Sequence, residues 1–158
     1  MNVCIVSGYF NPIHPGHISM IQDIKIEYPD CELVVIVNND HQVKLKKSIP
    51  FLDEAARCYI LQHIKNIDKV FLSIDQDSSI VQSLATIHTN IKEENNESCC
   101  DVYFFNGGDR DPHSASTPEV EFCNLNNIHL KYGYGGSKTY SSSELIQTSC
   151  NYLLTKYL

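Results

Sequence analysis

Short runs of apolar residues recur along the chain and predict buried strands. The runs cover residues 3–6, 33–37, 70–74, 102–105 and 128–132. The first four do not alternate with polar residues, which is typical of parallel strands covered on both faces. The fifth run alternates, which indicates a strand at an edge of the sheet.

Helical periodicity occupies the stretches between these runs. The predicted helices cover residues 17–28, 51–64, 79–88, 117–126 and 142 to about 157. Thr117, Pro118 and Glu119 form a helix start, because Thr is a good cap, Pro suits the first helical position and an acid suits the first turn. Ser141 and Glu144 fit a capping box at the start of the last helix. Residues 90–98 are polar and rich in turn formers, and are predicted to form a surface loop.

The alternation of strands and helices predicts an α/β fold. We expect a Rossmann-like three-layer sandwich with a mostly parallel sheet of about five strands, joined by right-handed crossovers. The chain has 158 residues, which is enough for one such core. The sequence therefore predicts a single domain over residues 1–158.

Charge and composition narrow the partners that the chain can have. It carries 12 Lys and Arg against 19 Asp and Glu, for a net charge of −7. This charge disfavours nucleic acid and anionic lipid as partners, so any phosphate site must be built locally. We find neither a signal peptide nor an apolar run of the ~20 residues that span a membrane, and we expect a cytoplasmic protein. The seven cysteines contain no C-x-x-C pair, which favours reduced thiols over a disulfide framework or zinc site.

The segments that follow the strands carry the candidate chemistry, because ligands of open parallel sheets bind beyond the carboxyl ends of the strands. After the first strand, His14 and His17 lie where a helix begins, a position that attracts phosphate. Gly8 and Gly16 would let a nucleotide approach the backbone, and the imidazoles can be charged near neutral pH. Two histidines are too few ligands for zinc, so no protein-held metal site is predicted.

Residues 10–17, Phe10-Asn11-Pro12-Ile13-His14-Pro15-Gly16-His17, resemble the H-x-G-H signature of the nucleotidylyltransferase superfamily. The nearest resemblance is to its cytidylyltransferase-like branch, which includes glycerol-3-phosphate cytidylyltransferase. It extends over most of the chain through further segments: Asn39-Asp40, Arg57, Asp68-Lys69-Val70, Gly107-Gly108-Asp109 and Ser141-Ser142-Ser143.

The resemblance implies that an acceptor phosphate attacks the α-phosphorus of a nucleoside triphosphate and expels pyrophosphate. It also implies a Mg²⁺ cofactor and commonly a homodimer. Such a reaction depends on positioning and charge neutralisation by preorganised donors. The residues expected to act in it fall into three groups. The catalytic group is His14, His17, Lys44 and Lys46; the nucleotide-binding group is Gly8, Tyr9, Phe10, Asn11, Gly16, Gly108, Asp109, Ser141, Ser142 and Ser143; the acceptor-binding group is Arg110 and Lys138.

Each of these assignments has a plainer alternative. The lysines can form a solvated loop, Asp109 can be an exposed turn residue, and one of the three serines is needed to cap the helix. In a chain of charge −7, a basic patch after the second strand is nevertheless what an anionic substrate requires. We expect one serine to cap and at least one to donate to a phosphate. Asp109 would orient the nucleotide or a hydrated Mg²⁺.

The family resemblance favours CTP as the nucleotide and a small phosphorylated alcohol or sugar as the acceptor. An adenylyltransferase that uses ATP with a sugar phosphate, phosphopantetheine or FMN is the alternative. The sequence departs from the family pattern at Asn11, where the family has Asp, and at Lys138, which replaces an Arg. These departures also keep open a nucleotide-binding regulatory module without turnover. A P-loop kinase is excluded because the stretch that ends in Lys138 and Thr139 follows the last strand.

Overall fold

The computed structural model describes residues 2–94, 100–107, 117–136 and 140–157. Its strands are β1 (Val3–Gly8), β2 (Glu32–Val37), β3 (Lys69–Leu72), β4 (Val102–Gly107) and β5 (His129–Tyr134). Its helices are α1 (Pro15–Glu27), α2 (Asp40–Leu45), α3 (Glu54–Gln62), α4 (Val81–Glu94), α5 (Pro118–Leu125) and α6 (Ser142–Tyr157).

The strands form one parallel sheet in the order β3-β2-β1-β4-β5. This arrangement confirms the predicted Rossmann-like α/β fold, and β5 lies at an edge as its alternating pattern indicates. From β1 the chain builds the sheet toward β3 on one side, then returns to place β4 and β5 on the other. The order therefore reverses beside β1, and in parallel sheets such a reversal opens a binding crevice beyond the strand ends.

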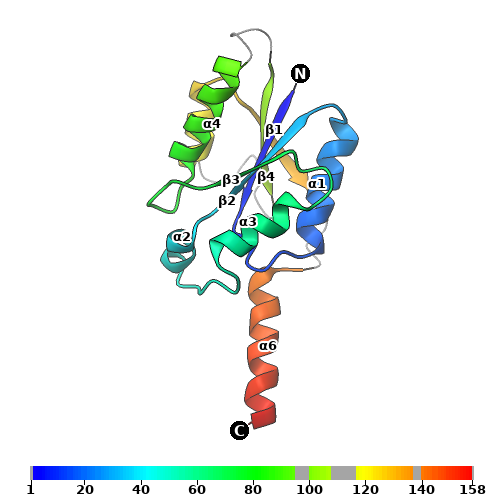
Figure 1. Ribbon diagram of the computed structural model, residues 1–158, viewed down its shortest axis with the longest axis vertical. Helices are drawn as coiled ribbons and strands as arrows, with labels where there is room; N and C mark the ends of the chain where they lie inside the picture. The colour runs from blue at the N-terminus through cyan, green and yellow to red at the C-terminus, as the bar shows by residue number, and fades with distance from the viewer. Residues whose placement is uncertain (1, 95–99, 108–116, 137–139, 158) are drawn as a thin grey trace.

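Helices cover both faces of the sheet (Figure 1). Neighbouring residues of β1 point to opposite faces, so Cys4 and Val6 pack with α1 and α3 while Ile5 packs with α4 and α5. Both sets are fully buried. This two-sided burial is the reason that the first strand reads as a continuous apolar run.

Two local expectations from the sequence are wrong. α4 continues to Glu94, so the first five residues of the predicted loop at 90–98 are helical. Ile91 is buried one helical turn after Ile87, and this burial holds the extra turn against the sheet. The second error is α2, where a loop was expected: Asn39 accepts the Gln42 N–H, and the Gln42 side chain accepts the Asn39 N–H in return.

The last helix, α6, extends away from the sheet (Figure 1). Its first residue is tied to the loop after β1, because the Ser142 hydroxyl donates to the Pro12 carbonyl oxygen at 2.8 Å. This contact brings the start of α6 to the carboxyl edge of the sheet. Within the described residues, no helix has the length and apolar character to cross a membrane.

Candidate active site

The loop after β1 is built around a buried aromatic ring. Phe10 has a left-handed backbone (φ 47°) and is 2% exposed. A Cβ at Gly8 would lie 3.1 Å from the Phe10 ring, and a Cβ at Gly16 would lie 3.1 Å from the His14 ring. Both glycines therefore make room for side chains of the loop itself, and their expected contact with a nucleotide stays a prediction. The unusual backbone at Phe10 is the kind of conformation that folds retain at functional sites.

His14 and His17 form a stacked pair, with ring centroids 3.8 Å apart. The His14 backbone N–H donates to His17 Nδ1 at 3.2 Å. Burial, together with the neighbouring His14, lowers the pKa of His17 to about 3. The lowered pKa favours the neutral ring at pH 7, and because Nδ1 accepts, its proton is on Nε2. His17 offers one oriented N–H donor.

A cleft of about 370 Å³ lies beside this pair and is called the histidine cleft here. It is lined by Tyr9, Phe10, Asn11, His17, Val43, Lys46, Ser48, Ser142, Ser143 and Ile146. The loop after β1, the segment around α2 and the start of α6 all contribute to it. Three segments that are far apart in the sequence, and that were each expected to bind phosphate, thus meet at one cleft.

The two predicted lysines lie at the carboxyl end of α2, with Lys44 in its last turn. Lys46 follows the end of the helix, and its Nζ lies 4.1 Å from the centroid of the Tyr9 ring. Both lysines are exposed, and Lys44 does not line either of the two clefts described in this section. From sequence both lysines were expected to bind phosphate; because residues two apart on a helical turn do not face each other, their side chains point in different directions. Of the two, Lys46 is the lysine that lines both described clefts.

Asn11 lines the histidine cleft, but its amide is already used within the fold. Its Nδ2 donates to the Ile49 carbonyl oxygen at 2.9 Å, and its Oδ1 accepts from the Phe51 N–H at 2.5 Å. An Asp at this position would lack the donor. The departure from the family pattern therefore matches a positioning role, in which Asn11 holds the segment before α3 over the cleft.

The three serines before and within α6 have different tasks. Ser141 Oγ accepts the Glu144 N–H at 3.2 Å and so caps the helix. Ser142 donates to Pro12 as described above, and its side chain lines the histidine cleft together with Ser143. Because Ser143 is exposed and reaches the cleft, it is the serine best placed to donate to a phosphate.

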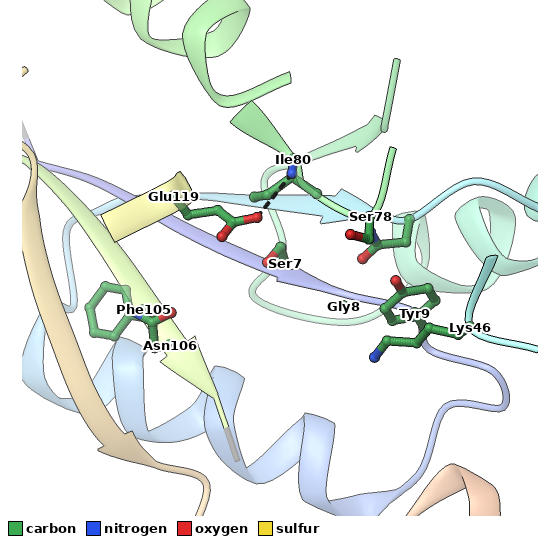
Figure 2. A pocket seen from close by; sticks show the side chains of 10 residues that line it. Ser7, Gly8, Tyr9, Lys46, Ser78, Ile80, Phe105, Asn106 and Glu119 are labelled. Carbon is green, nitrogen blue, oxygen red and sulfur yellow. Dashed lines mark hydrogen bonds between the residues drawn. The ribbon is translucent and has the colours of Figure 1, made fainter. Parts of the chain in front are cut away.

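A second cleft, of about 260 Å³, opens between the ends of β1 and β4 and is called the asparagine cleft here (Figure 2). It is lined by Ser7, Gly8, Tyr9, Asn38, Lys46, Ser78, Ile80, Phe105, Asn106 and Glu119. Tyr9 and Lys46 line both clefts and form their shared wall. The asparagine cleft lies where the strand order reverses, as expected for a ligand site of this fold.

Sequence reasoning missed Asn106 and Glu119 as site residues. Asn106 follows the apolar run at 102–105 directly, and this position is a signal that could have identified it. Glu119 follows a cap and a proline, so from sequence it is indistinguishable from an acid that serves the helix dipole. Only the fold shows that its carboxylate is 7% exposed and faces a cleft.

Arg57 holds the surroundings of both clefts in place. It is 1% exposed, and its Nη1 donates to the carbonyl oxygens of Tyr9 at 2.6 Å and Asn38 at 2.7 Å. Its Nη2 forms an ion pair with Asp40 at 2.6 Å. The loop after β1, the end of β2 and the start of α2 are thus joined through one guanidinium group, which positions the shared wall.

Four expected site residues, Gly108, Asp109, Arg110 and Lys138, lie outside the described residues. In the described part of the chain, no group of three His, Cys, Asp or Glu side chains is arranged to hold a metal ion. Mg²⁺ keeps several waters and commonly binds through one or two carboxylates and the phosphates of the substrate. The donor set here fits an ion that arrives with a triphosphate and does not fit a metal cage.

A doubly wound parallel sheet with a donor-lined cleft at the first helix is suited to binding the phosphates of a nucleotide. A sequence profile described as "Cytidylyltransferase-like" matches residues 5–132, and the chain belongs to this family. A solved structure, the lipopolysaccharide core biosynthesis protein from Thermoplasma volcanium GSS1, shares the fold with a TM-score of 0.60. That match has 23% identity and covers 84% of this chain and 93% of the other.

Curated relatives with similar sequences are named FAD synthase. The protein from Korarchaeum cryptofilum is 44% identical over 70 residues, which are 43% of this chain and 48% of the relative. The protein from Methanopyrus kandleri is 31% identical over 88 residues, which are 55% of this chain and 57% of the relative. The chain spans about half the length of the curated relatives that it matches.

Proposed function

We propose that this protein transfers an adenylyl group from ATP to the phosphate of FMN, forming FAD and pyrophosphate. The similarity to FAD synthases supports this proposal. FAD joins an FMN unit to an AMP unit through a pyrophosphate bridge, so a nucleotidyltransferase that makes it draws AMP from ATP. This adenylyl transfer takes the place of the CTP-dependent reaction that the sequence alone favours.

The reaction needs no covalent intermediate on the protein. An oxygen of the FMN phosphate attacks the α-phosphorus of ATP and forms a new P–O bond. The bond between the α-phosphorus and the bridging oxygen breaks, and pyrophosphate leaves with the electron pair. Donors fixed before the reaction stabilise the charge that develops on these oxygens. In the histidine cleft, the donors are His17 Nε2–H, the Lys46 ammonium group and the Ser143 hydroxyl group.

One observation carries the assignment of substrates to clefts: Tyr9 and Lys46 line both clefts. ATP bound with its phosphates in the histidine cleft and FMN bound in the asparagine cleft would bring their phosphates together at Lys46. Holding the reacting groups in this way supplies much of the rate enhancement of such transfers. Mg²⁺ bound to the triphosphate would neutralise part of its charge. A homodimer remains an expectation from the family resemblance.

Product analysis tests this function. The protein is incubated with Mg²⁺ and either ATP or CTP, together with FMN, glycerol 3-phosphate, a heptose phosphate or phosphopantetheine, and pyrophosphate and dinucleotide products are measured. We expect FAD and pyrophosphate in equal amounts from ATP and FMN. Turnover with CTP but not with ATP would overturn the assignment. Turnover with another acceptor but not with FMN would also overturn it. Tight binding of ATP without pyrophosphate release for any acceptor would instead indicate a regulatory module.

A further inference from the structure

The floor of the asparagine cleft contains a buried donor that the fold does not use. Asn106 is 3% exposed, and among the described residues its Nδ2 has no hydrogen-bond partner. Figure 2 shows its side chain at the end of β4, at the opposite end of the cleft from Lys46. A buried donor without a partner destabilises a fold, so such groups in native proteins call for an explanation. A bound ligand supplies one.

Glu119 lies at the same end of the cleft, on α5 (Figure 2). It is 7% exposed, and its Oε1 accepts the Ile80 N–H at 3.1 Å. This bond uses one oxygen of the two, and the carboxylate can accept a further hydrogen bond from a ligand. Its negative charge also repels a phosphate in this part of the cleft.

The two ends of the cleft thus differ in chemistry. Lys46 provides a positive charge at one end, and an amide donor lies beside a carboxylate acceptor at the other, with Ser7 and Gly8 between them (Figure 2). A ligand that fits this order has a phosphate at one end. At its other end it has an uncharged polar group that offers an acceptor and a donor side by side.

We infer that Asn106 and Glu119 determine acceptor specificity by binding the uncharged polar end of the acceptor, with its phosphate directed to Lys46. This inference rests on the proposed function. FMN has two parts with the required chemistry, the imide edge of its ring system and the hydroxyl groups of its ribityl chain. Both present a hydrogen-bond acceptor next to an N–H or O–H donor.

Kinetics of Asn106 variants test the inference. Asn106→Asp keeps the size and replaces the donor with an acceptor, while Asn106→Leu removes the polar group. We expect both to raise the KM for FMN about 10–100-fold and to leave the KM for ATP within about 2-fold. We also expect Asn106→Leu to have a Tm no lower than that of the wild type, because it removes an unsatisfied donor. Asn90→Asp, an exposed change on α4, is the matched control.

A purely structural role of Asn106 predicts the opposite result: a lower Tm for Asn106→Leu and an unchanged KM for FMN in Asn106→Asp. A rise in the KM for ATP instead of FMN would also overturn the inference. These failures differ from a failure of the proposed function, which would show as a wild-type protein that makes no FAD from ATP and FMN. A wild type that makes FAD beside variants with an unchanged KM for FMN would refute the inference alone.

Glu119→Gln, assayed with modified acceptors, identifies the group that is bound. The variant keeps an oxygen for Ile80 and replaces the second acceptor with a donor. If Glu119 binds the imide, the wild type and Glu119→Gln should have the same KM for a flavin substrate that is methylated at N3. If Glu119 binds a ribityl hydroxyl group, the two proteins should instead have the same KM for an FMN analogue that lacks this hydroxyl. The KM increase caused by Glu119→Gln could also be unchanged for both modified acceptors. This result would mean that Glu119 contacts neither group, and would overturn the role of Glu119.

Discussion

The two clefts share a wall but differ in their hydrogen-bonding character. The histidine cleft offers a ligand several hydrogen-bond donors, among them an imidazole N–H, an ammonium group and a serine hydroxyl, and no carboxylate is among the described residues that line it. The asparagine cleft pairs a donor, Asn106, with an acceptor, Glu119. Donors alone suit a polyanion, and a mixed pair suits an uncharged polar group. The chain has a net charge of −7 and as a whole repels an anionic substrate. The donors of the histidine cleft offset this repulsion locally.

The largest effect is expected in the histidine cleft. His17→Ala removes an oriented donor to the reacting phosphates and should lower kcat by about 10²–10³-fold, equivalent to about 3–4 kcal/mol. His63→Ala, an exposed change on the helical segment around α3, should leave kcat unchanged. Steady-state release of pyrophosphate measures both, and circular dichroism checks the fold. Turnover close to that of the wild type in His17→Ala would contradict the role given to His17.

The shared wall should show an intermediate effect. Lys46→Met removes a charge that lines both clefts and should raise the KM for ATP and for FMN about 10–100-fold. Lys44→Met, two residues away on the exposed side of α2, should change neither by more than about 2-fold. Because the lost contact is ionic, the salt dependence of both KM values should also weaken in Lys46→Met. Equal increases in KM for the two variants would mean that both lysines reach the substrates.

The smallest effect is on stability. His17 has a pKa near 3 in the folded protein and an ordinary value near 6.5 when unfolded. Between these values the unfolded state binds more protons, so the free energy of unfolding falls as the pH drops from about 6.5 toward 3. His17→Gln lacks this proton uptake. Urea denaturation should therefore show the wild type losing about 1–2 kcal/mol more than His17→Gln between pH 7.5 and pH 5. A constant difference between the two proteins would contradict the lowered pKa.

The parts of the fold that depend on local pattern could be predicted from the sequence. Apolar runs identify the strands of a two-sided core, and the cap at Thr117 marks the start of α5. α2 was missed because it is one short turn in a polar segment, although the Asn39 and Gln42 pair is a recognisable cap. The two lysines were therefore grouped from sequence, although one lies in the last turn of α2 and the other at its carboxyl end.

In the candidate site too, some residues could be predicted from the sequence and others could not. His14, His17 and the serines were expected from their positions at helix starts, and the expectation that they lie near one another needed only the rule that parallel strands end at one edge. Asn106 and Glu119 were missed because their significance depends on what surrounds them. An unpaired amide and a buried carboxylate are properties of an environment, and burial is decided by contacts between β4, α4 and α5.

By itself, the sequence determined the class of fold and the family. The order of the apolar runs indicates the fold, and the motif from Phe10 to His17 indicates the family. Only the tertiary structure decided which donors remain available to a ligand. The Asn11 amide bonds to Ile49 and Phe51, Gly8 lies against the Phe10 ring while it lines the asparagine cleft, and Lys46 lines both clefts. The physical reason is that hydrogen bonds and burial depend on groups brought together from distant parts of the chain, and a linear pattern records only which groups exist.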